Sequence, residues 1–559
     1  MTSASTYTGW VRVANLSDSA HESDLDLYVA KVPIGGTANL SVEGDTATIT
    51  YSFITVGSGD LLLGVLPHHQ NMLSSPSYKS PSWATLKGTL KTIVTSTLVL
   101  TQALTTITWK APRAIESGKL STITTSLASD YTATVNPGDP YFGGKSVAKL
   151  GRLALIADEI GESSKAATIR TNLKNEITDW ITGTYSNNPA IYESVWGGIC
   201  TQNSITDQHA DFGHGYYNDH HFHWGYWIYA AYCLGKEDSS WLSNYKDYVT
   251  DLCRDIANPS SDDTYFPRYR NFDWYDMHSW ASGIFSFGDG ANQESTSEAI
   301  NAWYALYLWG ALIENDNMKN IGRILLALEM RTAKKYWQIN DDEGVYAAPY
   351  ADNHVVGVLW ETKVDYATFF GADDEFIHGI QLIPITPICE EYYDSSWITQ
   401  QYPLLKSKTL DRDYPRPSGG LSILDGGSGY SGTSSSYSGH TVANQVETTS
   451  NGVGSGLKLN MNIRNSDGSI AEVFVQTRGS GYVQGETVSF AAGTGGLSNE
   501  GSGASVSINT AVPDGWKNFI YAEHAVIDKS AAWTEIAGLS GYDDGNTKTN
   551  MEYWVATRE

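Results

Sequence analysis

The residues best suited to catalysis lie in one short run of the chain. Residues 218–227 read Asn-Asp-His-His-Phe-His-Trp-Gly-Tyr-Trp, so Asp219 has three imidazoles and two indoles as close neighbours in sequence. A second acidic run, residues 292–298, reads Asn-Gln-Glu-Ser-Thr-Ser-Glu and leads into a strongly apolar segment. The two runs indicate a pair of carboxylates that work opposite each other.

Paired carboxylates and aromatic rings suit the hydrolysis of a sugar polymer. Breaking a glycosidic bond takes one carboxylic acid to protonate the leaving oxygen and one carboxylate to attack carbon or to activate water. Asp219 and Glu298 are the candidates. Aromatic rings stack on the apolar faces of sugars. Such rings flank both runs: Tyr216, Tyr217, Trp224, Trp227, Trp274, Tyr275, Trp280 and Trp303. A sugar is therefore the expected substrate.

Longer motifs carry a resemblance to a known family. Residues 219–226, 278–283 (His-Ser-Trp-Ala-Ser-Gly) and 292–303 resemble glycoside hydrolase family 81, the endo-1,3-β-glucanases, in order and in spacing. Further matches lie at 66–69, 86–88, 363–368, 378–381, 543–546 and 549–550. The resemblance covers nearly the whole chain outside one insertion. It implies an inverting endo-hydrolase of β-1,3-glucan (laminarin, callose or curdlan type) that uses no cofactor and no metal.

The resemblance also implies roles for individual residues. It assigns the general acid to Asp219 and the general base to Glu298, with the two carboxyls roughly 6.5–9.5 Å apart. Glu294 lies four residues before Glu298, and close carboxylates raise one another's pKa. Glu294 is therefore a modulator and the second candidate for the base. His223 is expected to bond the acid or a sugar hydroxyl. The other expected substrate contacts are Tyr217, His221, Trp224, Trp274, His278, Trp280, Asn292, Gln293 and His378.

Each carboxylate also has a purely structural interpretation. Asp219 suits the N-cap of a helix that begins near residue 222. Residues 295–298 fit the capping box, in which Glu298 would bond back to the helix start. From the pattern alone, the capping and catalytic interpretations are equally supported. The resemblance favours catalysis. A metal site at His220, His221 and His223 is disfavoured, because neighbouring residues point in different directions and no partner triad is evident.

Two rival functions stay open at this stage. One is a catalytically silent β-glucan-binding attachment module, which the intact Asp219 and Glu298 oppose. The other is a hydrolase of another glucan, such as an α-glucan, which the identity of the motifs opposes. One departure from the family pattern is Met277, which stands where the family usually has glycine and is expected to reshape the groove there.

Composition narrows the partners. With 36 Lys and Arg against 62 Asp and Glu, the net charge is −26, which opposes binding to nucleic acid or to an anionic membrane. A neutral polymer is the expected partner, and the chain is expected to be a monomer. The four cysteines are scattered, so buried free thiols are expected, with a Cys233–Cys253 bridge as the alternative.

The chain reads as multidomain β + α, because 559 residues exceed one hydrophobic core. Strands expected at 11–14, 25–32, 46–55 and 61–66 predict an N-terminal β-sandwich over 1–110. The resemblance implies that this domain is shortened. A connecting segment covers 111–145. Helical periodicity starts at 146, and further helices are expected at 166–181, 222–234, 240–256, 295–313 and 317–336. The resemblance implies an (α/α)6 barrel over 146–415, completed by 513–559. The sequence alone leaves other all-α arrangements open.

Residues 416–512 are an insertion rich in Gly and Ser. Gly-Ser-Gly-Tyr at 427–430 recurs at 479–482, and Gly-Ser-Gly at 454–456 recurs at 501–503, each of the latter followed by an alternating strand pattern. The repeat predicts folded β-structure, either an inert decoration or a glucan-binding element. Such repeats are common in viral and phage structural proteins, which suggests a viral or phage origin. The first residues show no signal peptide, although the resemblance implies an extracellular enzyme.

Overall fold

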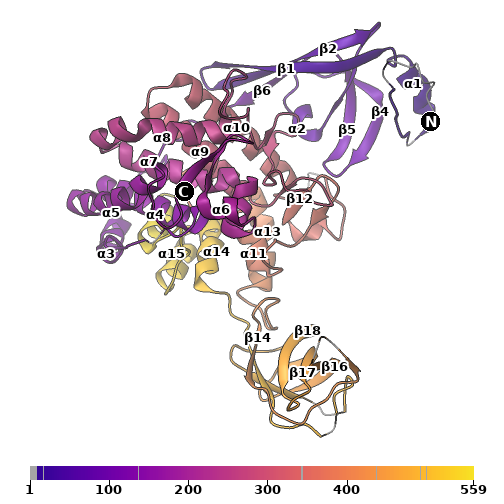
Figure 1. Cartoon of the computed structure of the whole chain (residues 1–559), viewed down its shortest axis with the longest axis vertical. Coiled ribbons are helices and arrows are strands. Elements are labelled where there is room, and N and C mark those ends of the chain that lie inside the picture. Colours follow the sequence, from indigo (N-terminus) through magenta and orange to yellow (C-terminus); the bar gives the residue numbers. More distant parts are fainter. Residues whose placement is uncertain are drawn as a thin grey trace.

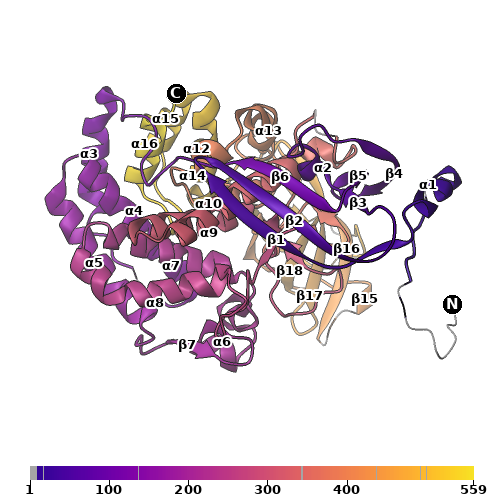
Figure 2. The same ribbon diagram turned by 90° about the horizontal axis from the view of Figure 1, so that it is seen from above.

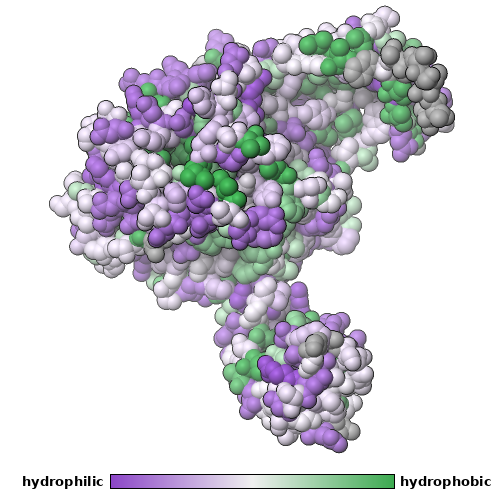
Figure 3. All heavy atoms as spheres, in the orientation of Figure 1, coloured by the Kyte–Doolittle hydropathy of each residue, from purple (hydrophilic) through white to green (hydrophobic). Residues whose placement is uncertain are grey.

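The computed structural model describes all residues except 1–8, 10, 17, 136, 342, 343, 436, 438, 491, 492 and 499. The chain is a mixed α and β, multidomain protein. A β-rich part comes first, a helical part follows, and a β-rich lobe is inserted before the last helices (Figure 1). Figure 3 shows this lobe joined to the rest by a narrow waist. We call it the β-module, residues 421–508.

The N-terminal part holds two three-stranded antiparallel sheets. Their orders are β1-β2-β6 and β3-β5-β4. The strands are β1 (Lys31–Glu43), β2 (Thr46–Gly57), β3 (Leu62–Val65), β4 (Tyr78–Thr85), β5 (Gly88–Val94) and β6 (Thr97–Ala103), with α2 (Pro67–Gln70) between β3 and β4. Strand β6 packs against helix α10 (Asp316–Tyr336), and Figure 2 shows the first sheet lying over the helical part there. The strands predicted at 46–55 and 61–66 are confirmed.

The two earliest strand predictions are wrong. Residues 11–14 form no strand, and 25–32 begins inside α1 (Glu22–Asp26), which follows the turn η1 (Ser19–His21). The reason is local capping. The Asp18 carboxylate accepts the backbone N–H of Ala20 at 2.9 Å, which starts a helical turn, and no residue of α1 is buried. Without a neighbouring strand to pair with, the apolar residues have no sheet to join.

The helical part contains the six predicted helices and two that were not predicted, α3 and α6. They are α3 (Leu120–Asp130), α4 (Pro140–Glu159), α5 (Ser163–Ile181), α6 (Gln202–Thr206), α7 (His220–Gly235), α8 (Ser239–Ala257), α9 (Thr296–Leu312) and α10. The helix predicted from 146 begins at Pro140, because the Asp139 carboxylate caps it by accepting the N–H groups of Tyr141 and Phe142 at 2.8 Å. Proline suits the first turn, where its missing N–H has no partner to lose.

Two helices lie at the centre of this part. Every residue of α7 is buried, and so is nearly every residue of α9. Helix α7 packs on α4 and on α9, while α9 also packs on α10. In contrast, α8 buries one stripe and exposes the other, and α10 is buried through its middle turns but exposed at its start. The central helices therefore hold their first residues in fixed positions, and these first residues carry the acidic runs.

The remaining helices and short strands complete the helical part. The helices are α11 (Asp374–Gly379), α12 (Cys389–Tyr392), α13 (Ser395–Lys408), α14 (Asp514–Ile527), α15 (Lys529–Ala537) and α16 (Lys548–Ala556). The short strands are β7 (Ala190–Glu193), β8 (Gly198–Thr201), β9 (Phe272–Asp273), β10 (His278–Ser279), β11 (Asn292–Gln293), β12 (Val358–Trp360) and β13 (Val364–Asp365). Three motif runs thus lie on short strands or at helix starts.

The β-module is folded, as the repeat predicted. Its strands are β14 (Leu421–Asp425), β15 (Ser434–Ser435), β16 (His440–Ser450), β17 (Ser455–Arg464), β18 (Ile470–Ser480), β19 (Thr487–Phe490) and β20 (Ser505–Ile508), in one seven-stranded sheet. Tyr430 and Tyr482 are buried, and each lies over a glycine, Gly501 and Gly454 respectively, where a Cβ would meet the ring at about 2 Å. The two repeats therefore hold each other by matching tyrosine with glycine.

All four cysteines are free and buried, as the sequence predicted. Within the described residues, no helix is both long and apolar enough to cross a membrane.

Candidate active site

Asp219 sits at the junction of a turn and α7. Its backbone is left-handed, with φ 52° and ψ 16°, a conformation that non-glycine residues rarely adopt. The Asp219 N–H donates to the carbonyl of Ala281 at 2.8 Å, which fixes the junction against the 281–292 loop. Burial, and then the charges of Glu294 and Glu298, raise the pKa of Asp219 well above its usual range. A carboxyl that stays protonated near neutral pH is what a general acid requires.

Glu298 lies in the first turn of α9 and is only 2% exposed. The hydroxyl of Tyr226, from α7, donates to Glu298 Oε1 at 2.7 Å. Burial raises the pKa of Glu298, while the charge of Lys145 acts in the opposite direction. The two central helices therefore place Glu298 opposite a phenol and near a cation.

Glu294 precedes α9 and is only partly buried. Its Oε1 accepts the backbone N–H of Phe369 at 2.7 Å. Burial is the main cause that raises the pKa of Glu294 to about 7, and the charge of Glu298 adds to it. Glu294 is thus a more accessible carboxyl than Glu298, with a pKa near neutrality.

The capping interpretations of the carboxylates are wrong. Asp219 occupies the N-cap position of α7, yet its side chain makes no capping hydrogen bond. Ser295 occupies the N-cap of α9, also without a capping bond, and its hydroxyl donates instead to the carbonyl of Ile380 at 3.1 Å. No capping box forms with Glu298. Neither carboxylate is therefore engaged in ending a helix.

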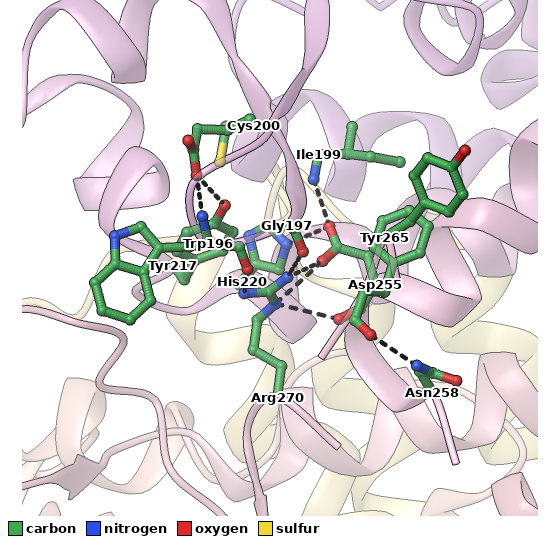
Figure 4. Close-up of polar contacts among 12 residues, drawn as sticks. Trp196, Gly197, Ile199, Cys200, Tyr217, His220, Asp255, Asn258, Tyr265 and Arg270 are labelled. Atoms are coloured by element: carbon green, nitrogen blue, oxygen red, sulfur yellow. Dashed lines mark hydrogen bonds and ion pairs between the residues drawn. The ribbon is translucent and has the colours of Figure 1, made fainter. Parts of the chain in front are cut away.

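A buried charge network anchors the start of α7 (Figure 4). Nε2 of His220, the residue after Asp219, lies 2.7 Å from the carboxylate of Asp255 in α8. That carboxylate also accepts from Arg270 at 2.7 Å and from the N–H of Ile199 at 2.8 Å. Although burial opposes its ionisation, His220 and Arg270 hold the pKa of Asp255 below its usual value. The anchor keeps the left-handed junction in place.

His223 points to another histidine. Its Nδ1 lies 2.9 Å from Nδ1 of His214, and the ring of His214 stacks on that of His220 at 4.6 Å. Burial lowers the pKa of His223 to about 3. The side chain is therefore neutral and extends the buried network. No group of His, Cys, Asp or Glu in the described chain is arranged to hold a metal ion.

The other predicted contacts divide by burial. Trp274 and Trp280 are half-buried and reach the surface, whereas the rest are buried. The buried ones are Tyr217, His221, Trp224, His278, Asn292, Gln293 and His378. Several of their polar atoms bond within the protein: His221 Nε2 lies 2.8 Å from the Ser279 hydroxyl, and the Trp224 N–H donates to the carbonyl of Ile199 at 3.0 Å. Side chains placed this way support the loops of the site from beneath.

Some residues around the carboxylates went unpredicted. Lys145, from α4, is 5% exposed and lies 2.7 Å from Asp543. Although burial opposes its charge, Asp543 and Glu298 raise the pKa of Lys145. Tyr141, one turn earlier on α4, also hydrogen-bonds Glu298. The Asp-Asp-Gly-Asn run at 543–546 was a usable signal, but nothing in the sequence connects Lys145 to it.

Exposed aromatic rings near the site were also missed. Phe287 lies 5.7 Å from Trp360 and 6.3 Å from Phe369, measured between ring centroids, and Phe285 lies 4.9 Å from Phe287. Phe369 is 58% exposed, and its N–H bonds Glu294. These rings form an aromatic surface beside the carboxylates, suited to the apolar faces of sugars.

Met277 does not reshape the groove as predicted. Its side chain is fully buried, so it packs into the core. Its backbone has φ 57°, in the left-handed region that glycine adopts without strain. Glycine in related sequences would suit this conformation, and methionine fills the core at the expense of local strain.

Comparisons with known proteins agree on one family. The Glycosyl hydrolase family 81 C-terminal domain model matches residues 114–444, and the Glycosyl hydrolase family 81 N-terminal domain model matches residues 1–112. The chain is 29% identical over 567 residues to a glucan endo-1,3-beta-D-glucosidase of Glycine max, covering 99% of this chain and 70% of that protein. It is 30% identical over 429 residues to a primary septum glucan endo-1,3-beta-D-glucosidase of Schizosaccharomyces pombe, covering 73% and 42% respectively.

A solved structure shares the fold. A glycoside hydrolase family 81 protein from Clostridium thermocellum superposes with a TM-score of 0.70 at 22% identity, covering 96% of this chain and 62% of that one. The chain thus spans only part of the length of these proteins. They come from a plant, a fungus and a bacterium, and give no support to a viral or phage origin.

Proposed function

Since the protein belongs to glycosyl hydrolase family 81, which confirms the resemblance, we propose that this glycoside hydrolase cleaves internal bonds of the β-1,3-glucan polymer. The observation that carries the proposal is the group of three carboxyls, Asp219, Glu294 and Glu298, whose pKa values are all raised by burial and that act on one another. Groups with perturbed pKa values beside aromatic surfaces mark catalytic sites. The names of the relatives supply the substrate class.

Asp219 is the proposed general acid. Burial, and then the charges of Glu294 and Glu298, raise its pKa and favour the protonated form, so it can donate its proton to the glycosidic oxygen as the bond to the anomeric carbon breaks. No hydrogen bond to the Asp219 carboxyl is recorded among the described residues, which leaves its proton available to a substrate. The anchor through His220 and Asp255 fixes the direction in which this carboxyl points.

Two carboxyls compete for the role of base. The motif assigns Glu298, whose ionised form Lys145 favours. Glu294 is more exposed and has a pKa of about 7, and a base with a pKa near the working pH takes a proton from water most effectively. The greater exposure of Glu294 therefore supports Glu294 as the base, whereas the charge of Lys145 supports Glu298. In either case water attacks the anomeric carbon from the face opposite the leaving oxygen, which inverts its configuration.

Paired variants decide between the two carboxyls. Glu298→Gln and Glu294→Gln are compared on glucan and on a glucosyl fluoride, with and without azide. The variant that has lost the base should be inactive on glucan and regain turnover of the fluoride with azide, because a small anion fits the space left for water. The other variant should keep part of its activity on glucan and gain nothing from azide.

Release of reducing ends from laminarin, compared with starch and xylan, tests the proposal as a whole. Activity on laminarin alone is the expected result. Activity on starch would favour a different glucan, and binding of laminarin without hydrolysis would favour the silent attachment module. Proton NMR of the first products should show the α-anomer, since a β-anomer requires a covalent intermediate and a nucleophilic carboxylate.

We also propose the finer architecture. Contacts link α9, α7, α4, α16, α14 and α11 in series, with α10, α8, α5, α3, α15 and α13 packed outside them. This alternation supports an (α/α)6 barrel of inner and outer helices, preceded by a β-sandwich and interrupted by the β-module. The junction of the two family models at residues 112–114 supports the first domain boundary. A neutral glucan partner, a monomer and an extracellular location complete the proposal.

A further inference from the structure

A cleft lies between the β7–β8 hairpin, helix α6 and the turn that precedes Asp219. It has a volume of about 600 Å³, within the range of roughly 300–1,000 Å³ usual for ligand pockets. The lining includes Trp196, Gln208, His209, Tyr216 and Ile284. No Lys or Arg lines it, whereas Glu193 and Asp207 do, so an anionic ligand is disfavoured. Figure 3 shows hydrophobic residues on this face near α6.

The most exposed ring of this cleft is Trp196. It is 55% exposed at the tip of the β7–β8 hairpin, and its indole projects away from the buried network (Figure 4). A single exposed apolar residue needs no explanation by itself. The unusual feature is the set of hydrogen bonds that fixes the backbone of its loop, because a hairpin tip does not need such bonds to fold.

Two buried or half-buried side chains hold the Trp196 loop. The carboxylate of Glu193 accepts the N–H of Val195 at 2.6 Å, the N–H of Trp196 at 2.9 Å and the hydroxyl of Tyr217 at 3.1 Å. Arg270 donates to the carbonyls of Trp196 and Gly197. Arg270 is itself paired with Asp255, so the anchor that fixes the start of α7 also fixes this loop. An indole on a loop whose backbone is already fixed loses little conformational entropy when a ligand stacks on it.

Backbone segments connect the lining of the cleft to the catalytic junction. The N–H of Ile284 donates to the carbonyl of Tyr216 at 2.8 Å. One residue nearer the site, the N–H of Gly283 donates to Asn218 Oδ1 at 2.9 Å. Asp219 and Ala281 then form the next bond, at 2.8 Å. Two backbone segments therefore run from the cleft directly to the acid.

We propose that this cleft is a distal sugar-binding subsite, in which a glucosyl unit of the same neutral chain stacks on Trp196. The side chain of Gln208 faces the same space, and the Tyr216 hydroxyl holds its Oε1 at 2.9 Å. Amides and imidazoles suit sugar hydroxyls as donors and acceptors. The inference rests on the proposed function, because the polymer cleaved at Asp219 is the one that extends into the cleft.

The test measures binding against chain length. Catalytically blocked Asp219→Asn protein is titrated by calorimetry with β-1,3-gluco-oligosaccharides of increasing length, with and without Trp196→Ala. Affinity for short oligosaccharides should be unchanged, and affinity for long ones should fall roughly 3- to 10-fold on loss of the stacking ring. Trp196→Phe should restore part of the loss. Phe474→Ala, on the β-module and equally exposed at 53%, is the matched control and should change nothing.

Each other outcome overturns the proposal. An equal loss for short and long oligosaccharides would mean that Trp196 only supports the fold of the site. No loss at any length would mean that the chain does not enter the cleft. If Asp219→Asn protein bound no β-1,3-oligosaccharide and the parent protein left laminarin intact, the proposed function itself would fail, a result distinct from both.

Discussion

The catalytic region and the β-module handle backbone strain in opposite ways. In the catalytic region, glycine fills some left-handed positions, such as Gly197 and Gly213, but many others hold residues with side chains: Asp211, Phe212, Tyr217, Asp219, Tyr269 and Met277. In the described β-module, Gln445 is the one such residue, and glycine occupies the other positions of this kind. Each strained residue costs about 1–3 kcal/mol and persists only where its surroundings force it. The strain therefore concentrates around Asp219, and the described β-module carries it only at Gln445.

Buried polar atoms follow the same division. His220 Nδ1, His221 Nδ1, Asn292 Nδ2 and Gln293 Oε1 are buried around the site without a partner in the protein. No atom of the described β-module is in that state. An unmet donor or acceptor costs about 1–3 kcal/mol, so the site carries a stability deficit that the module does not. The comparison shows that unpaired buried side-chain atoms gather in the helical part, several of them around the acidic runs, and not in the described β-module.

The largest effect should come from Asp219→Asn. Removing the proton donor at nearly constant volume should lower turnover of unactivated β-1,3-glucan about 10²–10⁴-fold, because the leaving oxygen is no longer protonated. Reducing-sugar assays measure the loss, and circular dichroism should be unchanged. Asp316→Asn, on the exposed start of α10, is the matched control. A variant with parental turnover would remove Asp219 from the mechanism.

Tyr482→Ala should separate the two regions by stability. Removing a ring that is 2% exposed and packed on Gly454 leaves a cavity, and should destabilise the β-module by about 3–5 kcal/mol. Calorimetry should show a low-temperature transition of the module alone, while activity on soluble laminarin persists. If the helical part melted at the same lowered temperature, the two regions would be one cooperative unit and the comparison would break.

Glu294→Gln should change how stability depends on pH. Burial raises the pKa of Glu294 to about 7 from an ordinary value near 4.5, so the folded state binds the proton more tightly than the unfolded chain. Stability from this group is therefore present at low pH and lost as the pH rises from about 4.5 to 7. Glutamine does not titrate, so the variant should be more stable than the parent at pH 8, by at most about 3 kcal/mol, and no more stable at pH 4.

Thermal denaturation at both pH values measures this difference. Glu22→Gln, at an exposed position in α1, should show no such pH dependence. If the stability difference between Glu294→Gln and the parent were the same at both pH values, the folded protein would not raise the pKa of this carboxyl.

The acidic residues were predictable because each lies within a long motif at the start of a helix. Asp219, Glu294 and Glu298 carry their signal in the neighbouring residues. Their partners do not: Lys145, Asp255 and Arg270 come from separate segments, and only the packing of α4, α7 and α8 brings them to the site. Periodicity predicted the longer helices because each buries apolar residues against its neighbours. It failed at residues 25–32 because this segment buries no residue and its first part has no strand to pair with.

The smallest effect should come from removing the β-module itself. Arg416 must remain, because it lies 2.9 Å from Glu375 in a buried cluster with Asp373 and Arg412, and its loss would leave buried carboxylates unpaired. The deletion should therefore start at residue 421 and end at residue 508. Leu421 pairs with Ile508 across β14 and β20, and Asn509 bonds back to Gly420 at 2.8 Å, so these ends are already adjacent.

Deleting 421–508 and joining the ends through glycine should leave activity on soluble laminarin within about two-fold of the parent, because loops joined at such sites tolerate change. Deleting 416–512 instead should lower the thermal stability of the helical part, since it removes Arg416. If the two deletion variants were equally stable, the buried cluster would not stabilise the connection between the helical part and the β-module. Loss of activity in the shorter deletion would show that the module takes part in the chemistry.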